Sequence, residues 1–245
     1  MITTILNLYK RPEYLAEQIK AIRSQSIPSQ EIWLWINETA ENKDIDPKNW
    51  DVDRYFYSSK NAKYHGRFAC GLLANTEYIA FFDDDTIPGK DWYKNCTDTI
   101  IHTPGILGGA GVSLLSSQYM HHHRMGWPTE NERTVEVDLV GHAWFMKRAH
   151  LSYMWYETPI SLDNGEDIQL SFLAQKYGNV KTYCPPHPAM YPEMWSSLKA
   201  EKYGTDNKAS SNGSIMPFNL FCYQRDAVVK HALRNGWKTV FGVTC

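Results

Sequence analysis

The chain has 245 residues, of which 43% are hydrophobic and 13% aromatic, and this composition excludes a disordered chain and suits one large domain with a buried core. Its 25 basic and 27 acidic residues give a net charge of -2, so the charge balance favours neither nucleic acid nor an anionic membrane as a partner. The five cysteines are an odd number without a CxxC pair, and therefore indicate neither a disulfide scaffold nor a zinc ribbon.

The first residues, MITTILNLY, lack the basic start and the long apolar core of a signal peptide. No later stretch approaches the ~20 apolar residues that a membrane span needs. We therefore expect no integral membrane segment and a cytoplasmic location, with peripheral attachment to a membrane left open.

Strands are predicted to alternate with helices as far as Gly89, which is typical of a parallel, Rossmann-like sheet. The predicted strands are Ile2 to Leu8, Glu31 to Ile36, Arg54 to Tyr57 and Tyr78 to Phe82. One helix follows Pro12 and places Leu15, Ile19 and Ile22 on a single face. A second helix follows Lys60 and is expected to bury Phe68, Leu72 and Leu73.

Three aspartates, Asp83, Asp84 and Asp85, directly follow the last of these strands, and Pro88-Gly89 ends the stretch. In an open α/β sheet, ligands bind at the carboxyl ends of the strands. Adjacent carboxylates repel one another, and a divalent cation would offset that repulsion. The pattern therefore favours a metal site over a solvated acidic turn.

Beyond Gly89 the pattern changes to a glycine-rich stretch, Ile106 to Leu115, and then to a long polar and aromatic segment that we expect to be a functional loop, Ser116 to Arg133. The later predicted elements are a strand from Val135 through Phe145, a helix opened by the turn Leu162 to Asp167, a strand from Val180 to Tyr183, a loop over Lys202 to Ser214 and a helix from Arg225 to Arg234. Asp163 or Asn164 is expected to cap the middle helix. Glu166 and Asp167 fall in its first turn, where the helix dipole favours negative charge even without a catalytic role.

The order of these features resembles the glycosyltransferases of the GT-A fold, in particular the inverting, family-2-like enzymes that use nucleotide-sugar donors. The matching stretches are NLYKRPEYL, NAKYHGRFACGLLANTEYIAFFDDDTIPGKDW with its DXD motif, VDLVGHAWFMKR, and GEDIQLSFLAQKYG with its xED motif. The resemblance implies a three-layer α/β sandwich, with a mostly parallel central sheet, helices on both faces and a small acceptor-side sheet. It implies a catalytic domain over residues 1–190, divided into a nucleotide-sugar half (1–110) and an acceptor half (111–190). We expect residues 191–245 to be a helical extension packed on it.

By this resemblance, Asp85 is the direct ligand of Mn²⁺ or Mg²⁺, and Asp83 reaches the metal through water or holds the ribose. Asp84 is expected to turn toward the nucleotide or the sheet. His187, held between prolines, matches the histidine that completes the metal shell in many such enzymes, and an imidazole among oxygen ligands favours Mn²⁺. A packed histidine without a ligand role stays open.

The xED motif implies the catalytic residues. Inversion at the anomeric carbon needs a base opposite the leaving group to take the proton of the acceptor hydroxyl. Asp167 is the expected base, and Glu166 is expected to bind a hydroxyl of the donor or acceptor. The implied activity is that of a hexosyltransferase.

The implied donor is a UDP-sugar, and the implied acceptor is a glycan or a glycoprotein. Residues of the first half are expected to bind the nucleotide, namely Leu8, Tyr9, Arg11, Asn37, Lys60, Asn61, Arg67, Asp83 and Asp84. Asn37-Glu38 replaces the aspartate that is common in the family after the second strand, which leaves the identity of the donor's nucleobase open.

The run His121-His122-His123 is interpreted as part of an aromatic acceptor lid rather than as a metal site, because adjacent residues rarely converge on one ion. Two other functions stay open. A haloacid-dehalogenase-type phosphohydrolase also places acidic residues after a strand, although its motif belongs on the first strand and Thr86 comes one residue too early. A carbohydrate-binding module without catalysis would not need the pair Glu166-Asp167.

Overall fold

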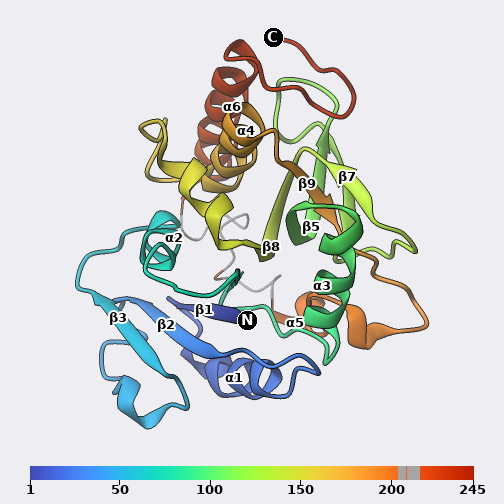
Figure 1. The fold of residues 1–245 in the computed structure, drawn as a ribbon. Coiled ribbons are helices and arrows are strands. Elements are labelled where there is room, and N and C mark those ends of the chain that lie inside the picture. Colours follow the sequence, from blue (N-terminus) through green and yellow to red (C-terminus); the bar gives the residue numbers. More distant parts are fainter. Residues whose placement is uncertain (204–207, 209–215) are drawn as a thin grey trace.

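The computed structural model describes residues 1–203, 208 and 216–245. In these ranges, nine strands form one mixed sheet in the order β3-β2-β1-β4-β8-β5-β9-β7, and β6 pairs with β5 outside this row (Figure 1). The strands are β1 (Ile2–Leu8), β2 (Glu31–Asn37), β3 (Arg54–Ser58), β4 (Tyr78–Phe82), β5 (Gly105–Leu114), β6 (His122–Gly126), β7 (Val135–Val137), β8 (Leu139–Lys147) and β9 (Lys181–Cys184).

The helices cover both faces of this sheet (Figure 1). They are α1 (Leu15–Arg23), α2 (His65–Gly71), α3 (Trp92–His102), α4 (Glu166–Gly178), α5 (Ala200–Tyr203) and α6 (Phe218–Arg234), together with the short helices η1 (Pro12–Tyr14), η2 (Pro47–Asn49), η3 (Arg148–Trp155) and η4 (Pro192–Met194). Apolar side chains of α1 and α3 form one core with the sheet, and those of α2, η3 and α4 form a second core. Two cores separated by one sheet make the three-layer α/β arrangement that the sequence predicts.

The first four strands in space, β3, β2, β1 and β4, are parallel, so their carboxyl ends meet at one edge. β8 then pairs with β4 in the antiparallel direction and brings residues of the second half beside that edge. The acidic residues after β4 therefore lie where the parallel half of the sheet meets the antiparallel strand β8, which is a place where α/β proteins bind ligands.

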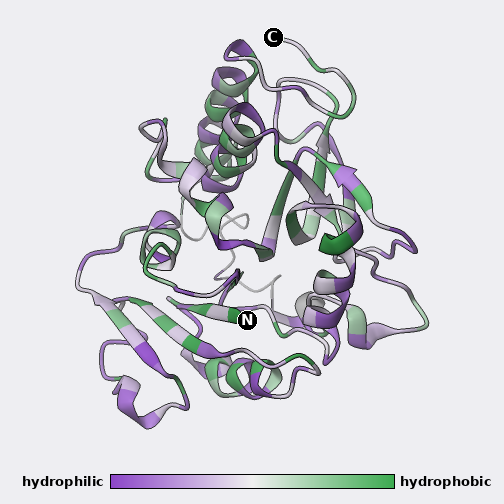
Figure 2. Ribbon diagram, in the orientation of Figure 1, coloured by the Kyte–Doolittle hydropathy of each residue, from purple (hydrophilic) through white to green (hydrophobic). Residues whose placement is uncertain are grey.

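The predicted helix after Pro12 is confirmed, and its position explains the path of the chain after β4. Leu15, Ile19 and Ile22 are buried on one face, and α1 carries hydrophobic and hydrophilic residues in alternating bands (Figure 2). Gln18 is also buried, and its Nε2 donates to the carbonyls of Asp83 (2.7 Å) and Thr86 (2.8 Å). Hydrogen bonds from α1 therefore hold the acidic turn in place.

Four local predictions differ from the structure. Leu72 and Leu73 are exposed because α2 ends at Gly71. The histidine run does not lie in a loop, since His122 opens the strand β6. The single strand predicted from Val135 is two strands, which meet at Asp138; its carboxylate accepts hydrogen bonds from the Leu114 and Val240 backbones (2.7 and 2.6 Å).

The fourth difference concerns the ends of helices. Neither Asp163 nor Asn164 caps α4, because the capping position is Gly165, with a φ of 87°. The last helix is longer than predicted and begins at Phe218.

Residues after 190 pack on the same body where the structure describes them. Tyr203 stacks on Tyr14 with ring centroids 3.7 Å apart. Val228 and Val229 of α6 join a core with Ile168 and Phe172 of α4. The loop predicted over Lys202 to Ser214 lies mostly outside the described residues. None of the described helices combines the length and apolar character required to cross a bilayer.

Candidate active site

A cavity of about 410 Å³ opens at the carboxyl ends of β1 and β4. Side chains from β5, β6, β8, α4 and α6 close its other sides. Its lining includes Tyr9, Arg11, Arg67, Asp83, Asp84, Asp85, Tyr119, Arg124, His142, Trp144, Glu166, Asp167 and Arg225. Both acidic motifs of the sequence therefore face one cavity.

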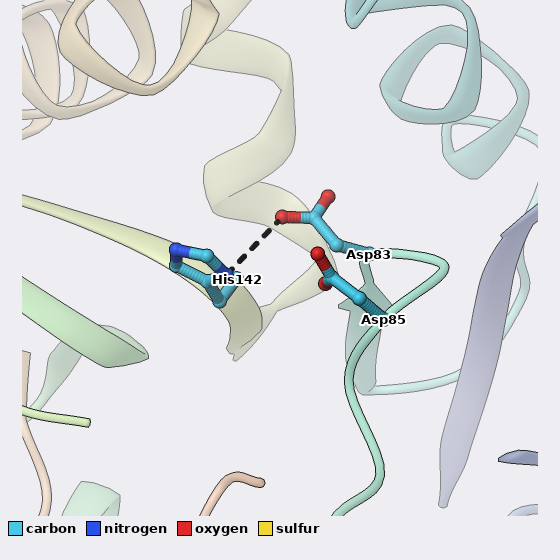
Figure 3. Close-up of side chains that lie close together, drawn as sticks. All are labelled: Asp83, Asp85 and His142. Carbon is cyan, nitrogen blue, oxygen red and sulfur yellow. Dashed lines mark ion pairs between the residues drawn. The ribbon is translucent and has the colours of Figure 1, made fainter. Parts of the chain in front are cut away.

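Asp83, Asp85 and His142 form a group that could hold a metal ion, with one ligand atom from each lying within 4.8 Å of the others. Figure 3 shows the imidazole directed toward the two carboxylates from the neighbouring strand, β8. His142 Nδ1 lies 3.8 Å from Asp83 Oδ2. Two carboxylates and an imidazole are ligands that a divalent cation accepts.

A β-bulge places His142 at this site. Between the paired residues Gly108–Trp144 and Ala110–Gly141, β8 has one residue more than β5. His142 lies in that bulge with a φ of 65°, in the left-handed region that non-glycine residues rarely adopt. Its carbonyl accepts the backbone N–H of Asp83 at 3.0 Å. The bulge therefore turns the imidazole out of the strand and holds it against the acidic turn.

The carboxylates of this group fit a cation. Asp85 is only 8% exposed, and burial together with the charges of Asp83 and Asp84 raises the pKa of Asp85 to about 8. A divalent ion would offset this repulsion. Asp84 is not part of this group and accepts hydrogen bonds from Arg11 Nη1 (2.7 Å) and from the Lys10 backbone (3.1 Å).

Glu166 and Asp167 face the same cavity from the first turn of α4. Asp167 accepts hydrogen bonds from Arg225 Nη2 (2.6 Å) and from the Ile168 backbone (2.8 Å). Glu166 is 5% exposed, and its Oε2 has no hydrogen-bond partner. Burial, followed by the charge of Asp167, raises the pKa of Glu166 to about 8.

Arg67 of α2 connects the two acidic groups. One end of its guanidinium contacts the Asp83 carboxylate, and Nη2 lies 3.7 Å from Glu166 Oε1. The guanidinium also lies over the Trp144 ring, 4.8 Å from its centroid. Because Arg67 is 2% exposed and packed on an aromatic ring, it fixes the relative position of β4 and α4 at the site.

Solved structures of Staphylococcus aureus TarS share this architecture. One TarS structure superposes with a TM-score of 0.53 at 17% identity, covering 76% of this chain and 36% of that one. The chain has a GT-A fold. TarS 1–349 in complex with UDP and with UDP-GlcNAc matches with TM-scores of 0.52 and 0.52, at 16% identity in both cases. These matches cover 75% of this chain and 59% and 57% of the TarS fragment, so the chain spans less than two thirds of the proteins it matches.

At such identities the likeness establishes the fold alone. No protein-family model matches the chain. The search of curated proteins also found no match.

In this GT-A fold, the residues predicted to bind the nucleotide divide into two groups. Tyr9, Arg11 and Arg67 line the cavity, and Asn61 reaches it indirectly by donating to the Tyr9 hydroxyl at 2.9 Å. Asp83 and Asp84 also line the cavity. The remaining three lie away from it: Leu8 is buried in the core, Asn37 uses its amide to bind the backbones of Ala62 and Lys63, and Lys60 is exposed outside the lining.

His187, expected from the sequence to complete the metal shell, does not belong to the group of Asp83, Asp85 and His142. The His187 ring is 0% exposed and is not part of the cavity lining. Nδ1 donates to the Pro185 carbonyl at 2.9 Å, and Nε2 accepts the Ser196 backbone N–H at 3.2 Å. Both nitrogens are therefore used within the protein, and the histidine that lies beside Asp83 and Asp85 is His142.

Sequence reasoning missed His142 and Arg225 as residues of the site, whereas Tyr119 lies in the segment expected to be an aromatic acceptor lid. His142 had one signal, a Gly-His pair inside an otherwise apolar strand opposite the DXD motif. Arg225 had none, because its contact with Asp167 across 58 positions of the chain leaves no local pattern.

Proposed function

We propose that this protein is a metal-dependent glycosyltransferase that moves a sugar from a UDP-sugar to a hydroxyl of a glycan or glycoprotein acceptor, with inversion. The observation that carries the proposal is the arrangement of one cavity, which has Asp83, Asp85 and His142 on one side and Glu166 and Asp167 on the other. A fold shared with TarS, whose fragment was solved with UDP and UDP-GlcNAc, supports the choice of donor.

The donor half would lie against β1, β4 and β8. Asp83, Asp85 and His142 would hold Mn²⁺ or, less favourably, Mg²⁺. The bound ion would supply a Lewis acid to the diphosphate as negative charge develops on it. Tyr9 offers a ring and Arg11 a cation at the carboxyl end of β1, where the nucleoside and its phosphates would lie.

The part of the cavity in which the reaction would take place lies against α4. Asp167 would take the proton of the acceptor hydroxyl while that oxygen bonds to the anomeric carbon. The bond from this carbon to the diphosphate oxygen breaks at the same time, and UDP leaves with the electron pair. Glu166 has a carboxyl oxygen without a hydrogen-bond partner, which suits it to bind a sugar hydroxyl.

The acceptor would enter between β6 and α6, where Tyr119, Phe218 and Phe221 line the cavity. Aromatic rings offer flat apolar faces to sugars. In this division residues 1–110 form the donor half together with His142 of β8, the other lining residues of 111–190 belong to the acceptor half, and the described part of residues 191–245 packs on the same domain.

The test is UDP release from a panel of UDP-sugars in the presence of Mn²⁺, followed with and without glycan acceptors. A transferase should release UDP slowly from one donor, faster with an acceptor, and EDTA should stop the release. Asp167→Asn should remove the activity and leave UDP affinity close to that of the wild type. Hydrolysis of phosphomonoesters would instead indicate a phosphohydrolase, and sugar binding without UDP release would indicate a binding module; either result would contradict the proposal.

A further inference from the structure

The C-terminal helix supplies a buried cation to the site. Arg225 lies on the face of α6 that packs against the start of α4, and its guanidinium contacts two residues there. Nη2 donates to Asp167 Oδ2 at 2.6 Å, and Nη1 donates to Asn164 Oδ1 at 3.0 Å. One rigid fork therefore binds the proposed base and the turn that leads to it.

Packing against aromatic rings also holds the guanidinium of Arg225 in place. Its carbon lies 3.8 Å from the centroid of the Tyr119 ring and 5.6 Å from that of Phe221. The side chain of Arg225 is buried, so water does not compete for its contacts. These contacts with a carboxylate, an amide and an aromatic face hold the guanidinium in one orientation. Its hydrogen bond to Asp167 then fixes the orientation of that carboxylate.

Arg11, Arg67 and Arg225 pair with different carboxylates of the cavity, and Asp167 pairs with Arg225. Arg11 pairs with Asp84 and Asp85, and Arg67 pairs with Asp83 and Glu166. Among the residues that the structure describes, the cation within ion-pair distance of Asp167 is Arg225.

The next residue of α6 holds the segment that carries Tyr119. Asp226 Oδ1 accepts the backbone N–H of Tyr119 at 2.6 Å. Two consecutive residues of one helix therefore anchor Asp167 and the segment that carries Tyr119.

We propose that Arg225 is a positioning residue for the chemical step: it holds the Asp167 carboxylate in the orientation in which it receives the proton of the attacking hydroxyl. This inference rests on the proposed function. Arg225 acts through Asp167 and does not bind the donor, so its loss should lower kcat and leave UDP affinity unchanged.

The experiment measures UDP release from the UDP-sugar by water, which needs no acceptor, for wild type, Arg225→Lys and Arg225→Ala. The alanine variant should lose about 100-fold in kcat, the scale on which a positioned base contributes. The lysine variant should keep part of the rate, because an ammonium retains the charge without the fork. Affinity for UDP with Mn²⁺ should stay within about twofold for both variants, which also shows that they fold. Arg234→Ala, on the exposed end of the same helix, is the matched control and should behave as wild type.

A double-mutant cycle separates positioning from a general structural role. If Arg225 acts through Asp167, adding Arg225→Lys to Asp167→Asn should lower kcat no further. Added guanidinium at a concentration that does not unfold the protein should also raise the rate of Arg225→Ala and not that of Arg234→Ala.

Three results would overturn the inference: an unaffected kcat in Arg225→Ala, a loss of UDP affinity equal to the loss of kcat, or multiplicative losses in the double variant. A wild-type protein that releases no UDP from any donor would overturn the proposed function as well, so the two failures are distinguishable.

Discussion

Glu166→Gln should stabilise the metal-free protein at alkaline pH. Glu166 is almost fully buried, and its Oε2 has no hydrogen-bond partner in the folded state. Burial and the neighbouring Asp167 raise the pKa of Glu166 from 4.5 to about 8, although Arg67 and Arg225 oppose the shift. Glutamine has the shape of the protonated side chain and cannot ionise.

The magnitude follows from the difference between the folded and unfolded pKa. Below pH 4.5 both states keep the proton, and the stability contributed by Glu166 is fully present. Between pH 4.5 and about 8 the unfolded state releases the proton and the folded state retains it, so stability falls as the pH rises. Each pH unit between these two pKa values lowers the free energy of unfolding by about 1.4 kcal/mol, so the total loss at pH 8 is at most about 5 kcal/mol.

The assay is urea unfolding followed by tryptophan fluorescence, in EDTA, at pH 5 and pH 8. At pH 5 the variant and the wild type should agree within about 1 kcal/mol. At pH 8 Glu166→Gln should be more stable by several times that difference, and the exposed substitution Glu130→Gln should not. A variant that is less stable than the wild type at pH 8 would refute the reasoning, because it would mean that the ionised carboxylate is stabilised by Arg67.

Three further predictions concern the base, the metal and the packing. Asp167→Asn should lower kcat for UDP release about 100- to 10,000-fold with little change in UDP affinity, and a variant that keeps more than a few per cent of the activity would exclude Asp167 as the base. His142→Ala should raise the Mn²⁺ concentration for half-maximal activity about tenfold or more, whereas His187→Gln should leave this concentration unchanged even if it lowers the Tm; the opposite pattern would restore His187 as the ligand. Gly89→Ala should destabilise the protein by about 1–3 kcal/mol in urea unfolding, because a Cβ there would lie 2.4 Å from the Glu193 carbonyl oxygen, and a stability equal to that of the wild type would contradict this packing.

The donor half of the fold could be predicted from the sequence because its signals are local. The strand Ile2–Leu8 has the bounds that its apolar run predicts, and the face formed by Leu15, Ile19 and Ile22 is buried. The acidic turn could be placed at a ligand-binding edge because parallel strands bring their carboxyl ends together.

The histidine that lies beside Asp83 and Asp85 could not be predicted from the sequence for a physical reason. His187 lies between prolines, and a stiff segment suggests a fixed ligand. His142 depends instead on a bulge, and this bulge exists only when β8 pairs with β5. Strand pairing between distant segments decides which histidine meets the carboxylates, and periodicity within one segment carries no information about it.

The same reason applies to the last helix. Its existence could be predicted, but its beginning at Phe218 and its role at the site could not. The contact between Arg225 and Asp167 joins two helices through an ion pair that no sequence spacing indicates.

That contact also sets the order in which the site can form during synthesis. Arg225 follows Asp167 by 58 positions, so a ribosome adding ~5–20 residues per second completes the pair about 3–12 s after it has made the base. The acidic turn after β4 and its parallel strands are made well before either residue. A nascent or prematurely ended chain would therefore contain Asp83 and Asp85 but would lack the contact between Asp167 and Arg225. Only a chain translated through α6 would have a complete site.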